Sequence, residues 1–261
     1  MIDVYFGKRA YAAPEAWNEL TRRQLLKVMA IFDSPLPHIQ GIILLTQILT
    51  NIPWWRFFRF RSPHLEDAAG QITGFLLEKN TLTRNLLPKY RRCYGPADGF
   101  GNLTMGEFSF TEAFFQSWRN SDDVDWLHKL IAVLYRPKRS NYDHKRNPDG
   151  DHREKFNPNL IEQRAKKIAR WPASVKKAIE QWYDGCRNQM IEQNPKVFEG
   201  GSGEESLHGM WSVMRNVAKA GHFGDFDKIA EQYVGTIMME LNEVVVEAER
   251  QEAELKKMKR Q

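Results

Sequence analysis

The sequence predicts an all-α, mainly helical protein with one small β-hairpin at its start. Apolar residues recur every three or four positions, most clearly at Val175, Ile179, Trp182, Cys186 and Met190. Polar helix-start residues and helix-ending prolines separate such segments along the chain. Strict alternation of apolar and polar residues, which is typical of strands, is confined to the first dozen positions.

The first fifty residues contain the hairpin and two helices. Residues 2–12 alternate in polarity, and Gly7-Lys8 is placed to form the turn of a hairpin. Thr21 with Gln24 three residues later is the pattern of a capping box, which predicts a helix start. The helix expected over 39–51 is apolar on nearly all sides and is therefore expected to be buried. It is shorter than the roughly 20 residues that a membrane-spanning helix needs.

Residues 54–61 alternate aromatic and arginine side chains (WWRFFRFR). Such a stretch could stack on the bases of single-stranded nucleic acid. The alternative is a segment that caps the core while its arginines reach solvent, and we prefer it because stacking sites use several separated platforms.

The segment from Gly101 to Phe156 combines the greatest aromatic content with sharp helix boundaries. Thr104 is predicted to cap a helix, with Glu107 at the capping-box position. Aspartates at 122, 123 and 125 favour the start of the next helix through the helix dipole. Pro137 ends that helix.

Three regions are predicted along the chain: a helical body with the hairpin over residues 1–198, a glycine-rich linker at 199–203, and a C-terminal helical segment over 204–261. The last helix is expected to begin near Asp225, a favourable N-cap. Its apolar seam runs through Ile237, Leu241, Val244 and Ala248. Beyond Val246 charged residues predominate, which predicts a projecting end.

Overall composition is that of an ordinary globular protein with a moderate positive charge. The net charge is +5 and the pI about 9.1, which permits nucleic-acid or acidic-protein contacts without a histone-like excess. The cysteines, Cys93 and Cys186, form no CxxC pair, which fits a reducing compartment. The first residues lack the apolar core of a signal peptide. We therefore expect a protein of the cytoplasm.

Metal-capable side chains gather in one polar stretch: Asp143, His144, Asp149, Asp151, His152 and Glu154. Their spacing fits neither a calcium loop nor a zinc site. We interpret the stretch as an exposed loop whose Asp151, Arg153 and Glu154 cap the following helix. No nucleophile elbow, phosphate loop or dinucleotide fingerprint is present, so no catalytic, cofactor-binding or metal residue is predicted, and no enzyme.

The order of parts resembles a known family. An opening hairpin, the motif Trp17-Asn18-Glu19-Leu20-Thr21-x-x-Gln24 and a helical body with Leu134-Tyr135-Arg136-Pro137 resemble tail-assembly proteins of tailed bacteriophages and prophages, most closely the tail assembly chaperones. The resemblance covers about residues 1–198 and is one of pattern. It implies a largely helical protein without cofactor or active site, which keeps a tape-measure protein soluble until tail-tube subunits polymerise around it.

The resemblance implies a protein partner, a tape-measure-like protein or a tail-tube subunit. A chaperone for a long amphipathic helix needs apolar grooves, and five aromatic residues are the candidates to line one: Trp54, Trp55, Phe114, Phe115 and Trp118. A structural core would use the same residues, and it is the better single explanation for most of them. The extra region after Gly203 leaves a virion tail or connector component as an alternative. Nucleic-acid binding through residues 54–61 and self-association are the further alternatives, and no membrane contact is expected.

Overall fold

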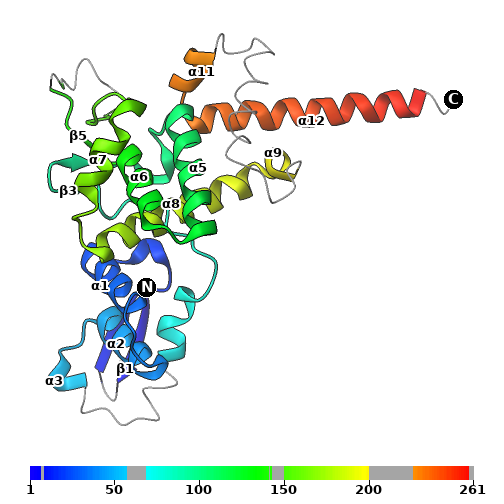
Figure 1. Ribbon diagram of the computed structural model, residues 1–261. Coiled ribbons are helices and arrows are strands. Elements are labelled where there is room, and N and C mark those ends of the chain that lie inside the picture. Colours follow the sequence, from blue (N-terminus) through cyan, green and yellow to red (C-terminus); the bar gives the residue numbers. More distant parts are fainter. Residues whose placement is uncertain (7–8, 58–68, 141, 143–149, 200–225, 259–261) are drawn as a thin grey trace. The chain divides into compact units, whose positions relative to one another are not determined.

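The structure is a computed structural model and describes residues 1–6, 9–57, 69–140, 142, 150–199 and 226–258 (Figure 1). It confirms a mainly helical fold with a small antiparallel hairpin at the N-terminal end. The described residues group into two compact units, one within Met1–Leu87 and Arg170–Cys186, the other within Pro88–Ala169 and Arg187–Gln261. The predicted linker at 199–203 lies almost wholly outside the described residues, so the predicted division of the chain stays a prediction.

The first unit consists of the hairpin and a small set of helices. Its elements in chain order are β1 (Ile2–Phe6), β2 (Arg9–Ala13), η1 (Trp17–Glu19), α1 (Arg22–Phe32), α2 (His38–Thr50), α3 (Trp54–Phe57), η2 (Gly74–Leu76) and the first part of α8 (Ala173–Gln193). The hairpin pairs Ile2 with Ala13 and Phe6 with Arg9. Its predicted turn at residues 7–8 lies outside the described part.

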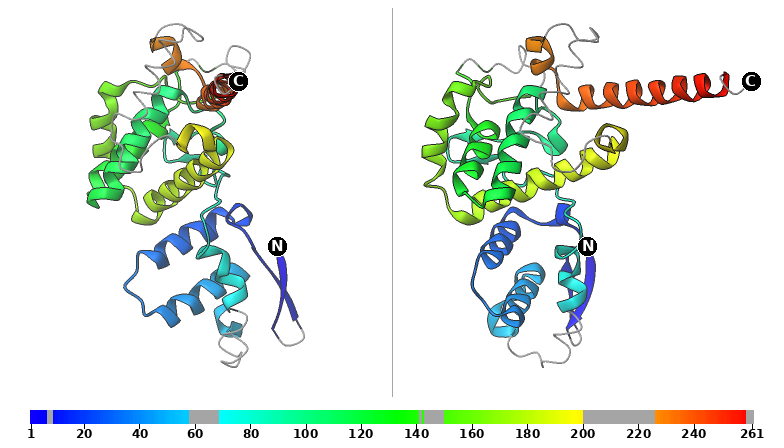
Figure 2. Two further views of the ribbon diagram at one scale, coloured as in Figure 1. Left: turned by 90° about the vertical axis from the view of Figure 1, so that its right-hand side faces the viewer. Right: turned by 45° about the vertical axis from the view of Figure 1, so that its right-hand side comes forward.

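Helices α1 and α2 pack against each other, and α2 also contacts β2 (Figure 2). The predicted capping box is confirmed, because Thr21 Oγ1 accepts from the Gln24 backbone N–H while Gln24 Oε1 accepts from that of Thr21. Gln24 also donates to the carbonyl of Leu49, which ties the start of α1 to the end of α2. Asn51 ends α2 in the left-handed conformation, a common way to stop a helix.

Helix α8 holds the segment that follows η2. Trp182, which lies in the middle of an apolar helical stripe, is 2% exposed, and its indole Nε1 donates to the carbonyl of Thr83. Asn80 donates to the carbonyl of Gln181 and to Asp184. This close approach requires Gly185, where a Cβ atom would lie 2.3 Å from the carbonyl oxygen of Leu82.

The second unit is built on three packed helices. Its elements in order are β3 (Lys89–Tyr90), β4 (Cys93–Tyr94), η3 (Asp98–Phe100), α5 (Met105–Ser121), α6 (Val124–Leu134), β5 (Arg136–Pro137), η4 (Pro158–Leu160), α7 (Ile161–Ile168), the end of α8, α9 (Pro195–Glu199), α11 (Phe226–Glu231) and α12 (Val234–Met258). The three short strands form one antiparallel sheet in the order β3-β4-β5. Helix α6 packs on both α5 and α7.

The predicted helix boundaries of this unit are largely confirmed. Thr104 caps α5 by accepting from the backbone N–H of Glu107, and Asp123 caps α6. The side chain of Glu107 does not close a capping box, because it is buried and paired with arginines. Asp125 contacts His128 one turn along α6, with its carboxylate oxygen 3.2 Å from Nδ1. The imidazole is 7% exposed, whereas the Asp125 side chain is 75% exposed, so the pair lies at the edge of the core.

Backbone hydrogen bonds attach the C-terminal helices to α5. The Met105 N–H donates to the Gln232 carbonyl at 2.8 Å, and the Val234 N–H donates to the Leu103 carbonyl at 2.9 Å. At Gly106 a Cβ atom would lie 3.0 Å from the carbonyl oxygen of Ala230, so α11 lies directly against α5. No helix in the described part of the chain is both long enough and apolar enough to span a membrane.

Candidate protein-binding surfaces

The five aromatic residues predicted to bind a partner lie on two helices. Trp54 and Trp55 belong to α3 in the first unit, whereas Phe114, Phe115 and Trp118 belong to α5 in the second. Each unit therefore presents its own set of aromatic side chains.

Helix α3 presents its tryptophans to solvent. Trp54 is 69% exposed and Trp55 is 47% exposed, while Phe57 on the same turn is buried. The Arg56 guanidinium lies 4.8 Å from the Trp55 ring centre, within cation–π range. Arg59 and Arg61, which complete the predicted arginine–aromatic stretch, lie outside the described residues.

The aromatic residues of α5 mainly pack within their unit. Phe114 stacks on Trp126 with ring centres 5.8 Å apart. Phe115 is 4% exposed, so a partner could reach its ring only if the unit opened. Trp118 is half-buried. The role of these residues in partner binding stays a prediction, while the contacts of Phe114 and Phe115 show them contributing to packing.

Helix α12 exposes apolar side chains that the list of candidate residues left out. Its first part is buried in the second unit, with Ile237 and Met238 0% exposed. Farther along, Val244 is 43%, Val246 47% and Met258 64% exposed. A long helix that is anchored at one end and leaves apolar side chains uncovered at the other is typical of a docking element. The signal in the sequence was the seam itself, which continues past the last buried residue.

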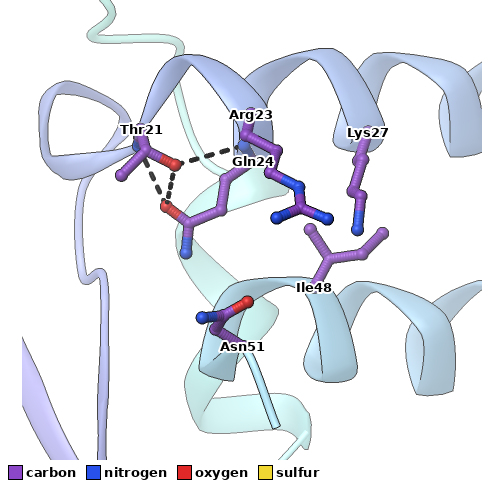
Figure 3. A pocket seen from close by; sticks show the side chains of 6 residues that line it. All are labelled: Thr21, Arg23, Gln24, Lys27, Ile48 and Asn51. Atoms are coloured by element: carbon purple, nitrogen blue, oxygen red, sulfur yellow. Dashed lines mark hydrogen bonds between the residues drawn. The ribbon is translucent and has the colours of Figure 1, made fainter. Parts of the chain in front are cut away.

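A shallow polar depression lies between α1 and α2 (Figure 3). Its volume is about 150 Å³, and the lining residues are Thr21, Arg23, Gln24, Lys27, Ile48 and Asn51. Typical small-molecule sites are larger, about 300–1,000 Å³. The cationic side chains of Arg23 and Lys27 sit near the carbonyl end of α2, where positive charge is favourable.

A buried cluster of four charged residues lies in the second unit, and sequence reasoning missed it. Arg153 is 0% exposed, so the prediction of an exposed loop that caps the next helix is wrong at this position. Its Nε lies 2.8 Å from Asp151 Oδ1, and its Nη2 lies 3.2 Å from Glu107 Oε2. Arg136 Nη2 lies 2.6 Å from the other oxygen of Glu107. Two positive and two negative charges therefore meet in the core.

The arginines of this cluster also satisfy buried backbone carbonyls. Arg136 donates to the carbonyls of Glu154 and Val133, and Arg153 donates to those of Asn102 and Leu134. Residues 137–139 pair with residues 152–154 through backbone hydrogen bonds, and this pairing fixes the base of the loop between them. The cluster therefore connects α5, the end of α6 and residues 151–154, which follow the loop. Its geometry is that of a group of side chains that stabilises the fold.

Burial and ion pairing shift the pKa values of the charged side chains in this cluster in opposite directions. Burial lowers the pKa of Arg136, and Glu107 opposes this effect. For Arg153 burial acts in the same direction, but Glu107 and Asp151 outweigh it and raise its pKa. Burial acts to raise the pKa of Asp151, yet hydrogen bonds from Arg153 hold it below its ordinary value of 3.8.

Metal-capable residues do not converge within the described ranges. Among the residues that the structure places, no group of three or more His, Cys, Asp or Glu side chains could hold a metal ion. Asp143, His144 and Asp149 lie outside those ranges. His152 instead contacts aromatic rings, with its ring centre 4.1 Å from that of Tyr142 and 5.6 Å from that of Tyr94.

Comparison with known proteins adds no relative to these observations. No protein-family model, curated protein or solved structure matches this chain.

Proposed function

We propose that this chain is a non-enzymatic tail-assembly protein of a tailed bacteriophage or prophage that acts through protein–protein contacts. In this proposal it behaves as a chaperone for a tape-measure-like protein or a tail subunit. The pattern of the opening hairpin, the capping-box motif and the Leu134–Pro137 motif supports the family. The observation that carries the mode of action is α12, which is anchored in its unit at Ile237 and Met238 and exposes Val244 and Met258.

A chaperone of this kind must shield a long amphipathic helix until assembly begins. Helix–helix docking uses apolar side chains at three- and four-residue spacing, and α12 presents such side chains on a helix of 25 residues. At 1.5 Å per residue this helix is about 38 Å long. The start of the helix is buried in its own unit, and the part from Val244 to Met258, which carries exposed apolar side chains, spans about 21 Å.

The test is co-expression of this chain with the tape-measure protein encoded in the same genome. We expect the soluble fraction of the tape-measure protein to rise several-fold, and the two to co-elute from a size-exclusion column. A matched variant, Val244→Asp, should remain folded because that side chain is exposed, yet it should lose the effect. Equal solubility with and without this chain would contradict the proposal. Recovery of the chain in mature particles would favour a virion tail or connector component.

Nucleic-acid binding is the second candidate, and the exposed tryptophans of α3 favour it. Trp54 and Trp55 are accessible for base stacking, and Arg56 lies beside them. Binding of labelled single-stranded DNA should then weaken steeply with salt, because phosphate contacts release counterions. The double variant Trp54→Ala/Trp55→Ala should abolish that binding.

A further inference from the structure

Helix α12 carries a heptad pattern along its length. Apolar residues alternate at spacings of three and four at Val234, Ile237, Leu241 and Val244. In sequence the spacing continues through Ala248, Gln251, Leu255 and Met258, with Gln251 as its polar member. Apolar residues repeated in this way form the seam along which two helices wrap around each other.

Seam residues are buried at the start of α12, whereas Val244 is exposed farther along it. Val234 is 1% and Ile237 0% exposed, Leu241 is half-buried, and Val244 is 43% exposed. From Val244 to Met258 the helix advances about 21 Å at 1.5 Å per residue. The unit itself thus covers the start of the seam, whereas Val244 and Met258 lie exposed farther along it.

One of the two rows of positions that flank the seam is acidic, whereas the other row contains Met238, Val245 and Glu252. Glu240 and Glu247 precede the seam residues Leu241 and Ala248, and in sequence Glu254 precedes Leu255 in the same way. These are the positions from which coiled-coil helices reach across to a partner. Glu247 accepts from Gln251 at 3.1 Å and lies 3.7 Å from Arg250, but these contacts are exposed and therefore weak.

A second copy of this chain fits the flanks poorly. In a parallel pair the flanking Glu247 would face Glu252 of the other copy, although Glu254 would face Lys259. In an antiparallel pair the row of glutamates (Glu240, Glu247, Glu254) would face the same row of the other copy. Like charges at these positions oppose pairing, whereas lysine or arginine there would favour it. The flanks therefore select a partner with the opposite charge.

We propose that α12 docks an amphipathic helix whose apolar seam is flanked by lysine or arginine side chains. This rests on the proposed function and names the chemistry of the partner that the function requires. The apolar seam supplies affinity, and the row of glutamates determines which helices are accepted.

Two synthetic peptides of about four heptads test the proposal with the full-length protein. Both carry leucine and isoleucine on the seam, but one has lysine and the other glutamate at every flanking position. In fluorescence-anisotropy titrations we expect the lysine peptide to bind on the order of tenfold more tightly or better. Its affinity should fall as salt is raised from low to high ionic strength.

A charge-swapped variant and a matched control sharpen the test. Glu247→Lys/Glu254→Lys should invert the preference toward the glutamate peptide. The control Glu243→Lys/Glu249→Lys makes the same change in net charge at positions away from the flanks, and it should keep the preference for the lysine peptide. Circular dichroism should give the same helical content and melting temperature for both variants as for the wild type.

Three outcomes would overturn the proposal. Equal binding of the two peptides would show that the glutamates do not select the partner, and binding of neither would show that α12 docks no such helix. A dimer in light scattering that Val244→Asp abolishes would show that a second copy covers the seam. If the tape-measure protein is still solubilised in any of these cases, the proposed function stands and only the charge-selected docking on α12 fails.

Discussion

Glu107 and Arg136 form an ion pair inside the second unit, with Oε1 2.6 Å from Nη2 and side chains that are 3% and 1% exposed. Glu107 also pairs with Arg153, so its removal would leave two buried guanidinium groups short of negative charge. We expect Glu107→Gln to lower the free energy of unfolding by about 3–5 kcal/mol, the usual cost of breaking a buried ion pair from one side. Urea unfolding followed by circular dichroism measures it.

The matched control is the more exposed pair on the same helix. Glu112 binds Arg187 through both carboxylate oxygens, at 2.8 and 2.9 Å from Nε, and the two side chains are 15% and 23% exposed. Glu112→Gln should cost clearly less, because water can solvate the remaining guanidinium. If the two variants lost the same free energy of unfolding, the deeper burial of the Glu107 cluster would not make its ion pairs more important for stability.

Asp151 links the stability of the second unit to acid pH. Its folded-state pKa is held below the ordinary value of 3.8, so its contribution is complete above that value and is lost as the pH falls through the folded-state pKa. We expect Asp151→Asn to be less stable than the wild type at pH 7. The gap should narrow as the pH is lowered below about 4. Urea midpoints over this range measure the gap, and a constant gap would contradict the linkage.

Trp182 is expected to be among the most sensitive side chains of the first unit. Trp182→Ala should cost about 3–5 kcal/mol as a large truncation in the core. Trp182→Phe keeps most of the apolar contact but loses the hydrogen bond to the Thr83 carbonyl, and it should cost less. Chemical denaturation separates the two variants. A loss below about 1 kcal/mol for alanine would show that the indole is not packed.

Gly185 can be compared with Gly235, since both lie within helices. A Cβ atom at Gly185 would come within 3 Å of three backbone atoms of Leu82, so Gly185→Ala must displace the segment from α8. Among the residues that the structure describes, nothing lies within 4 Å of a Cβ atom placed at Gly235, so alanine there should stabilise α12 by roughly 0.5–1 kcal/mol. Melting temperatures that move in opposite directions are the expected result, and a tolerated Gly185→Ala would mean that the contact relaxes easily.

The sequence predicted those parts of the fold that depend on local signals. Thr21 with Gln24, Thr104, Asp123 and the stripe around Trp182 each specify a helix start or face through neighbours on the same segment. Capping residues and apolar periodicity are therefore sufficient to predict these helix starts and buried helix faces.

The buried charge cluster could not be predicted in this way. Glu107 and Arg153 are 46 positions apart, and Glu107 stands where a capping-box residue is expected, so its local pattern pointed to a different role. The polar stretch that contains Arg153 read as exposed because a charged side chain is seldom buried without partners. The pairing of Arg153 with Glu107 becomes apparent only when α5 and residues 151–154 are placed together in the fold. For Phe115 the sequence left two interpretations, a partner groove or the core, and the 4% exposure of its side chain agrees with the core.

Two truncations distinguish the anchoring part of α12 from its docking part. A chain ending at Asn242 keeps Ile229, Val234, Ile237 and Met238, which are all buried in the second unit. Its melting temperature should therefore be close to that of the wild type, yet it should fail to solubilise the tape-measure protein.

A chain ending at Gly200 loses all four of these residues, and burial of each contributes roughly 1.5–3 kcal/mol to stability. It also loses the backbone bonds to Leu103 and Met105, so its second unit should unfold at a lower temperature. Full partner binding by the chain ending at Asn242 would place the docking surface elsewhere, and the aromatic residues of α3 and α5 would be the next to test.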